Sequence, residues 1–255
     1  MKTLRFILPL CFLFFLAGCV DIDENVNINK DGSGQLVMDM DLSQMVEFLQ
    51  ASIGKDELAK KGMAKMDTTI YLKDVVDTLS SMSAEKKALL RPGSVNIKVD
   101  LDEKVFKTHM KFPFTSLDNL QKLYATISDG SLGSTQLLKG LVGGQGAADA
   151  GSPSPDINEF NGIYDFTCKD GTMIKKLNQE KWKALISDPQ VAQAKQAAQM
   201  GVEIMYTTTI QFPRPIKNVD NSLAKLSDDK KTVTIKYNLM DLFDHPEQFG
   251  YNIAY

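Results

Sequence analysis

The sequence predicts an α+β fold in which an antiparallel sheet, built from β-hairpins, carries its helices on one face. Two observations predict this class. Apolar and polar residues alternate with a period of two over 20–42 and 94–114, and a short polar turn divides each stretch. Apolar residues recur at helical spacing over 43–90 and 116–127. A similar alternation of hairpins and helices resumes after residue 156, so the order of elements allows two similar halves.

The first hairpin, over 20–42, has the clearest alternation. Its first strand places apolar residues on one parity and acids or asparagines on the other, and only Glu24 breaks the apolar series, which is Val20, Ile22, Val26 and Ile28. Residues 30–34 contain two glycines and form the turn. The return strand is expected over 35–41.

Three helical segments are expected next, over 43–53, 55–66 and 73–90, with Ser43 as the N-cap of the first. Arg91-Pro92-Gly93 ends this block. The second hairpin pairs 94–101 with 105–114, and Ser116 begins a helix that runs through Ile127.

The remaining chain begins with a stretch rich in Gly, Ser, Ala and Pro over 129–156, which is typical of a flexible loop. Strands are then expected over 160–168 and 172–177, a helix after Asn178 and another from Asp188-Pro189 to about residue 200. A long strand over 202–212, a hairpin over 222–237 and a short helical tail over 240–249 complete the chain. The chain is therefore expected to divide into a signal (1–18), the first half of an α+β domain (19–128), the flexible loop (129–156) and the second half (157–255).

The first 18 residues have the three parts of an export signal. Lys2 and Arg5 precede an apolar run over 6–16, and Leu16-Ala17-Gly18-Cys19 follows. The run is too short to span a bilayer. The last four residues resemble the lipobox of bacterial lipoproteins, which implies cleavage before Cys19 and acylation of that cysteine. A plain signal peptide with an accidental cysteine is the alternative.

Charge and cysteine content narrow the function further. Loss of 1–18 removes two basic residues and no acid, so the net charge falls from −3 to −5. The sequence has no basic stripe, which would favour nucleic-acid binding, and no polybasic patch, which would favour binding to anionic lipid. The membrane contact is therefore expected through the lipid on Cys19. Of the three cysteines, Cys11 leaves with the signal, and Cys168 is expected to be a buried strand residue.

No catalytic, metal or cofactor site is expected from the motifs. His109 and His245 lie far apart in sequence, and each has the context of an ordinary strand or surface histidine. The stretch 27–32 imitates a calcium loop, but Met38 stands where the loop needs a bidentate Glu, so a hairpin turn is favoured. The acidic pairs are expected on solvated surface; they are Asp39/Asp41, Asp100/Asp102 and Asp228/Asp229.

Two stretches resemble LppM-type lipoproteins of the bacterial envelope. One is Cys19-Val20-Asp21-Ile22 leading to the turn at 29–34, and the other is Thr209–Ile216 with the hairpin that turns at 227–231. Arg214 follows Pro213 where the family usually has Gly. The resemblance implies an α+β domain on the envelope without established catalytic residues.

The leading hypothesis is therefore a non-enzymatic envelope lipoprotein that binds or scaffolds a lipid or an envelope protein at the membrane surface. Two alternatives remain. The first is a membrane-tethered hydrolase, favoured if the fold brings His109 or His245 within hydrogen-bond reach of a serine or an acid. The second is a lipid-binding protein with a groove lined by Met and Phe, because methionine suits adaptable apolar surfaces.

The location is predicted from the residues after the lipidated cysteine. Val20, rather than an aspartate, follows Cys19 and favours the outer membrane. The acids at 21, 23 and 24 resemble the export tags of Bacteroidetes surface lipoproteins. The protein is therefore expected on the periplasmic or the surface side of the cell envelope.

Overall fold

The structure, a computed structural model, describes residues 18–60, 64–78, 82–128, 157–189, 191, 195 and 202–255. Its large sheet has eight strands, β1 (Gly18–Ile28), β2 (Gly34–Asp41), β3 (Lys65–Tyr71), β4 (Ser94–Asp100), β5 (Val105–Phe114), β8 (Val202–Gln211), β10 (Ala224–Leu226) and β11 (Thr232–Asn238). A second sheet has four, β6 (Tyr164–Lys169), β7 (Thr172–Leu177), β9 (Asn218–Asp220) and β12 (Tyr251–Ala254).

The helices are short. The α-helices are α1 (Ser43–Ile53), α2 (Lys55–Leu58), α3 (Ala84–Leu90), α4 (Leu117–Ser128), α6 (Ile157–Gly162) and α7 (Gln179–Ile186). Four 3₁₀ turns are η2 (Leu72–Asp74), η3 (Val76–Thr78), η4 (Leu239–Phe243) and η5 (Pro246–Phe249). The α+β class predicted from the sequence is confirmed.

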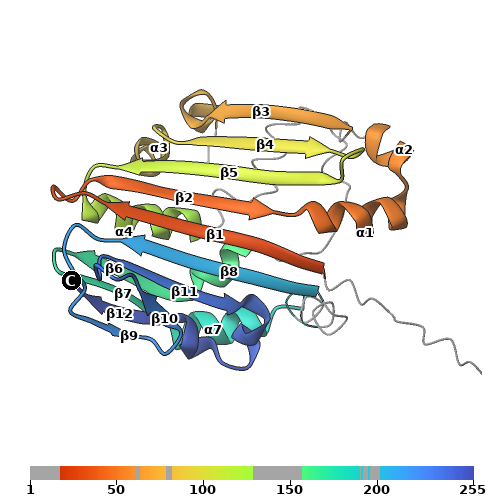
Figure 1. Ribbon diagram of the computed structural model, residues 1–255. Coiled ribbons are helices and arrows are strands. Elements are labelled where there is room, and N and C mark those ends of the chain that lie inside the picture. Colours follow the sequence, from red (N-terminus) through yellow and green to blue (C-terminus); the bar gives the residue numbers. More distant parts are fainter. Residues whose placement is uncertain are drawn as a thin grey trace, which may run out of the picture.

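The large sheet has the strand order β10-β11-β8-β1-β2-β5-β4-β3 (Figure 1). Every neighbouring pair is antiparallel except β1 and β8, which run parallel. Two strands joined by a hairpin run antiparallel. A parallel pair instead needs a long connection that returns the chain to the end of the sheet at which the first strand began. Because β8 lies beside β1, strands from before and after the 129–156 stretch share one sheet.

One face of the large sheet is covered and the other is open. Figure 1 shows α4 and the four-stranded sheet together behind the large sheet. Apolar side chains on alternate positions of the large sheet fill the space between the layers, and many are fully buried; examples are Ile22, Leu36, Phe112 and Ile210. Helix α4 therefore lies on the covered face, as expected, together with a second sheet that the sequence did not predict, whereas α1 and α2 lie at one end of the large sheet (Figure 1).

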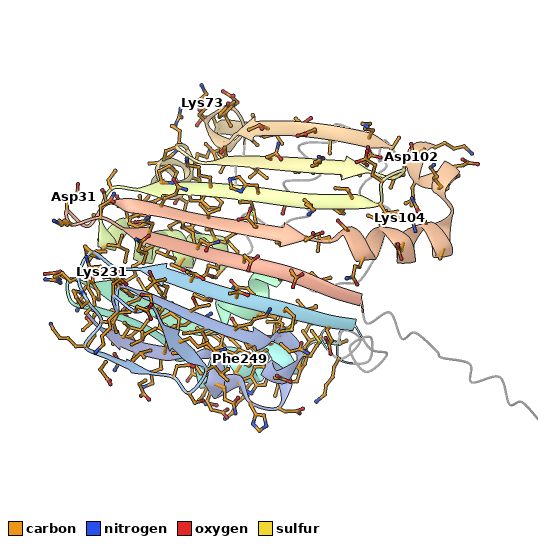
Figure 2. The ribbon with its side chains drawn as sticks, viewed as in Figure 1. Asp31, Lys73, Asp102, Lys104, Lys231 and Phe249 are labelled. Carbon is orange, nitrogen blue, oxygen red and sulfur yellow. The ribbon has the colours of Figure 1, made fainter. Side chains whose placement is uncertain are left out.

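The two hairpins predicted in the first half are confirmed, as β1 with β2 and as β4 with β5. The tip of the first carries Asp31 at one end of the sheet, and the tip of the second lies at the other end with Asp102 and Lys104 (Figure 2). The turn interpretation of 27–32 is confirmed, since the Asp31 carboxylate accepts from both the backbone N–H and the hydroxyl of Ser33.

Several predicted helices are wrong. The segment 55–66 is helical only near its start, and Lys65–Tyr71 forms strand β3 at the edge of the sheet. Its β-branched residues suit a strand, and pairing with β4 outweighs local propensity. The segment 73–90 is two 3₁₀ turns followed by α3, and the helical tail 240–249 is two 3₁₀ turns.

Other boundaries also moved. The strand expected over 160–168 begins only at Tyr164, after α6, and β9 and β12 were missed because each is very short. Asn178 and Ser116 cap their helices as predicted. Ser43 does not, because its hydroxyl accepts the backbone N–H of Phe106 on β5.

Residues 1–17 of the signal predicted over 1–18 and the loop at 129–156 lie outside the described residues, as does most of the helix expected up to residue 200. Among the helices that the structure describes, none combines the length and the apolar character needed to cross a membrane.

Candidate functional site

The open face of the large sheet carries two central rows of polar side chains that run across the strands. Cross-strand register places Thr207, Asp23, Asp39, His109 and Asn96 in one row. The adjacent row contains Asp21, Asp41, Lys107 and Lys98. Antiparallel sheets commonly leave one polar face to solvent, so the face itself agrees with the alternation seen in the sequence.

Four aspartates meet at the centre of this face. Asp21 lies directly opposite Asp41, and Asp23 lies directly opposite Asp39, in the β1–β2 ladder. Like charges placed directly opposite destabilise a sheet. The fold therefore maintains an acidic centre that its own stability disfavours.

Within the described chain, only the β2 members of these pairs have a side-chain partner. Lys107 Nζ lies 2.8 Å from Asp41, and His109 Nδ1 lies 2.6 Å from Asp39. Partial burial favours a higher pKa for Asp41, but its hydrogen bonds to Lys107 and Ser43 outweigh this and lower the pKa. Within the part of the chain that the structure describes, Asp21 and Asp23 form no side-chain hydrogen bond or ion pair.

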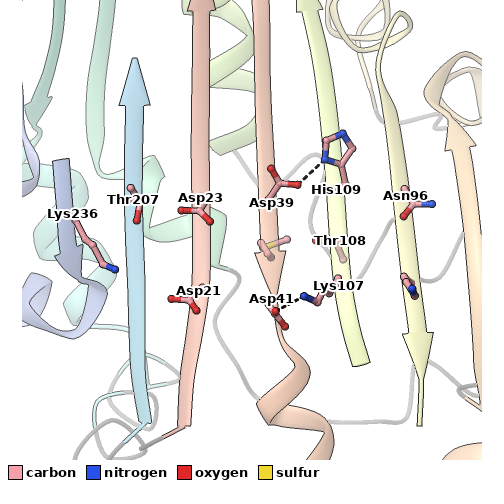
Figure 3. Close-up of a pocket in the computed structure, with 12 residues that line it drawn as sticks. Asp21, Asp23, Asp39, Asp41, Asn96, Lys107, Thr108, His109, Thr207 and Lys236 are labelled. Atoms are coloured by element: carbon pink, nitrogen blue, oxygen red, sulfur yellow. Dashed lines mark hydrogen bonds and ion pairs between the residues drawn. The ribbon is translucent and has the colours of Figure 1, made fainter. Parts of the chain in front are cut away.

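The sheet is hollowed at this place (Figure 3). The hollow has a volume of about 650 Å³ and includes all four aspartates, with Lys236 and Lys98 at its two sides. Figure 3 shows the carboxylates of β1 and β2 side by side, with dashed contacts only toward β5. No group of three or more potential metal ligands lies close enough to hold an ion within the described residues. The arrangement suits contact with cationic groups of a partner.

His109 was expected to be an ordinary strand residue, and the structure places it in this hollow. Its imidazole is about half exposed and contacts the Asp39 carboxylate. A histidine within hydrogen-bond reach of an acid was expected to favour the hydrolase alternative, so this contact favours it. Nucleophilic catalysis also requires a serine, threonine or cysteine hydrogen-bonded to the histidine. In the described chain, no such side chain is hydrogen-bonded to His109.

A second polar cluster lies on the covered face of the same strand. Glu24 is 2% exposed, and its two carboxylate oxygens accept hydrogen bonds from Tyr124 and Tyr206, each at 2.6 Å. The Tyr206 hydroxyl also accepts from the Asn161 amide at 3.1 Å, and the Asn161 carbonyl accepts from Lys175 Nζ at 3.0 Å. These five residues, the Glu24–Lys175 network, come from β1, α4, β8, α6 and β7.

Burial controls the ionisation of this network. It raises the pKa of Tyr124 and Tyr206 well above 10, and the nearby Glu24 carboxylate raises both further. Burial lowers the pKa of Lys175, an effect that the Glu24 charge opposes. Tyr237 stacks on Tyr206 with ring centroids 5.2 Å apart, and burial raises its pKa as well.

Sequence reasoning missed this network. One signal was available, since Glu24 is the single polar residue on the apolar parity of β1. Its partners were not recognisable, because Tyr206 is 182 residues away along the chain.

The other predicted residues are placed as follows. Cys168 is a buried residue of β6, as expected, and burial raises the pKa of its thiol to about 12. His245 is exposed, with Nδ1 3.8 Å from Glu247. For Cys19 the structure gives the backbone alone, in β1 opposite Glu203 of β8.

One acidic pair is not simple solvated surface. Asp100 is 3% exposed; its carboxylate accepts the backbone N–H groups of Asp102 and Glu103 and lies 2.8 Å from Lys65. These contacts lower the pKa of Asp100, and the hydrogen bond from Lys65 has the largest effect. It is buried because it closes the β4–β5 turn, whereas Asp102, Asp228 and Asp229 are exposed.

The methionines occupy two kinds of position. Met38 and Met173 are core residues, as a pliable core predicts. Only Met40 lines the hollow on the open face, among the residues described there. This hollow is therefore not a groove lined by Met and Phe.

Comparison with known proteins gives one structural likeness. No protein-family model matches the chain, and no curated protein matches it in sequence. It is similar to the folded domain of the Mycobacterium tuberculosis LppM protein, solved by NMR, with 10% identity and a TM-score of 0.37 over 95% of this chain and 93% of that one. A TM-score this low carries neither fold nor function from one protein to the other.

Proposed function

We propose that this protein is a lipid-anchored, non-enzymatic binding protein of the bacterial cell envelope. The observation that supports this most strongly is the position of Cys19, which ends the lipobox-like Leu16-Ala17-Gly18-Cys19 and also stands at the start of β1. A strand rises about 3.3 Å per residue, so Asp21 and Asp23 follow the anchor by roughly 7 and 13 Å. The acidic centre of the open face would then lie close to the membrane surface.

Binding is favoured over catalysis by the character of the hollow. Its aspartates are set against one another at a cost to stability, and two of them have no partner in the described chain. Cationic side chains of an envelope protein would supply the missing charge. Val20 after Cys19 favours attachment to the outer membrane.

The anchor can be tested in a Gram-negative host by labelling with an alkyne-bearing fatty acid. We expect Cys19→Ala to abolish labelling and Cys11→Ala to leave it unchanged, since both cysteines lie near the N-terminus but only Cys19 follows the lipobox residues. Equal labelling of the Cys19→Ala variant would contradict the proposal.

The binding surface can be tested separately by zero-length carbodiimide cross-linking in isolated envelopes, which joins carboxylates to amines in direct contact. We expect one cross-linked partner for the wild type and its loss in Asp21→Asn/Asp23→Asn. Asp220→Asn, on the other sheet, is the matched control and is expected to retain the product. Unchanged cross-linking in the double variant would argue against this face.

A tethered hydrolase is the second candidate, favoured by the 2.6 Å contact between His109 and Asp39. It predicts turnover of ester or amide model substrates that His109→Ala abolishes. Turnover that persists in His109→Ala would not come from this pair.

A further inference from the structure

A second cavity lies on the covered side of the molecule, away from the acidic hollow. It has a volume of about 420 Å³ and lies among α4, α6, β6 and β7. Side chains that line it include Tyr124, Ala125, Asn161, Tyr164, Phe166 and Lys175. Pockets for small molecules are typically of this size and are mainly apolar with a few well-placed polar groups.

One of the polar groups that line this cavity, the ammonium group of Lys175, is on a buried residue. Lys175 is 6% exposed, and its Nζ donates to Asn161 Oδ1 at 3.0 Å. Nζ also lies over two tyrosine rings, with the Tyr164 centroid at 4.7 Å and the Tyr206 centroid at 6.0 Å. An ammonium group has three donors, so two of them lack an acceptor within the described chain.

The hydrogen bonds of the Glu24–Lys175 network all run in one direction. Lys175 donates to Asn161, Asn161 to Tyr206, and Tyr206 to Glu24. The carboxylate at the far end is already occupied by two tyrosine hydroxyls. It therefore balances the charge of Lys175 from a distance and leaves the free donors of Nζ for a ligand.

The walls beside this cation are aromatic. Tyr124 and Phe166 pack with ring centroids 4.1 Å apart, and Tyr164 lies against the ammonium group. Lysines outnumber acids three to one around the cavity, counting Lys122, Lys175 and Lys181 against Asp165. Asp165 is already paired with Lys181 at 2.9 Å.

We propose that this cavity is a binding site for a small aromatic acid, whose anionic group contacts Lys175 Nζ and whose ring packs against Tyr124 and Phe166. The anion supplies the acceptor that the ammonium group lacks. The ring gains aromatic contacts and burial, the usual source of affinity in such pockets. The volume suits one or two fused rings.

The proposal is tested by isothermal titration of the purified full chain with four probes. We expect 2-naphthoate to bind with a 1:1 stoichiometry. We expect at least about tenfold weaker binding for 2-naphthamide, which lacks the charge, for decanoate, which lacks the ring, and for inorganic phosphate, which lacks an apolar body. Equal binding of the amide would overturn the role of Lys175, and equal binding of decanoate or phosphate would overturn the aromatic acid as ligand.

Two pairs of variants place the site. Lys175→Met is expected to weaken 2-naphthoate binding at least about tenfold, whereas Lys183→Met, the same change at an exposed lysine of α7 that does not line the cavity, is expected to leave it within about twofold. Because Lys175→Met removes the counter-charge of Glu24 and can affect folding, Ala125→Trp fills the cavity mouth from an exposed position on α4, with Ala88→Trp on α3 as control. Wild-type affinity in Ala125→Trp would place the binding elsewhere and overturn the proposal.

Discussion

Asp23 and Glu24 are neighbours on β1, yet their carboxylates lie on opposite sides of the strand, in opposite environments. Asp23 faces the open hollow, opposite another aspartate, without a partner in the described chain. Glu24 faces the covered side, where each of its oxygens accepts a tyrosine hydroxyl. Water solvates the first carboxylate, whereas the protein must supply every partner of the second.

This contrast separates two kinds of site. The open face tolerates unpaired charge at small cost, so it is free to present charge to a partner. The Glu24–Lys175 network must be complete to be tolerated at all, because a partly satisfied buried network is unfavourable. The incomplete part of that network is the Lys175 end, where the second cavity lies.

High pH should disturb the covered side most. Burial raises the pKa of Tyr124, Tyr206, Tyr237 and Tyr251 well above 10, so above pH 10 the folded state holds protons that the unfolded chain loses. Stability must then fall as pH rises, by on the order of 1.4 kcal/mol per pH unit for each tyrosine. Lys175 acts the other way, but only up to about its ordinary pKa of 10.5. Urea unfolding between pH 9 and pH 12, followed together with tyrosinate absorbance, measures this.

The tyrosines should ionise only as the protein unfolds. If absorbance rises in full while the fold remains intact, the hydroxyls around Glu24 are accessible and the contrast between the two sides fails.

Removal of the buried carboxylate is the next largest effect. Glu24→Ala leaves two buried hydroxyls without their acceptor and Lys175 without its counter-charge, so a loss of about 3–5 kcal/mol in the free energy of unfolding is expected. Asp23→Ala, one residue away on the open side, is expected to change it by no more than about 1 kcal/mol. Urea unfolding of both variants checks this, and equal effects would contradict it.

Tyr206→Phe is expected to cost less, about 1.5–3 kcal/mol, because it removes the hydrogen bond to Glu24 and the acceptor of the Asn161 amide but leaves the ring stacked on Tyr237. Tyr71→Phe is the control, since Tyr71 is 57% exposed on the edge strand β3. Thermal unfolding compares them. A loss in Tyr71→Phe as large as in Tyr206→Phe would mean that removing a tyrosine hydroxyl costs the same outside the network as within it.

The sequence predicts the open side well and the covered side poorly, for a physical reason. Alternation reports which side of a strand meets water, so the polar row of β1 and the two hairpins were recognisable. It does not report which strands pair across the chain, so the parallel β1–β8 contact was missed. Glu24, Tyr206 and Lys175 meet only because of that contact and the second sheet.

His109 illustrates the same limit on the open side. Its strand and its outward direction were predictable, but the Asp39 carboxylate beside it depends on the pairing of β2 with β5. The start of β3 shows the reverse error, since the helix predicted over 55–66 relied on local pattern, whereas pairing with β4 makes its last two residues part of a strand.

The smallest effect has the opposite sign. Asp23→Asn removes one of two like charges placed opposite each other, so it should stabilise the fold by about 0.2–1 kcal/mol. Salt screens the same repulsion, so the gain should shrink at high ionic strength. Asp220→Asn, exposed on β9 opposite Asn252, is the control and should show neither effect. Urea unfolding at low and high salt tests both variants. A loss of stability in Asp23→Asn would show that the carboxylate has a partner within the protein, and its place in the proposed binding surface would then be lost.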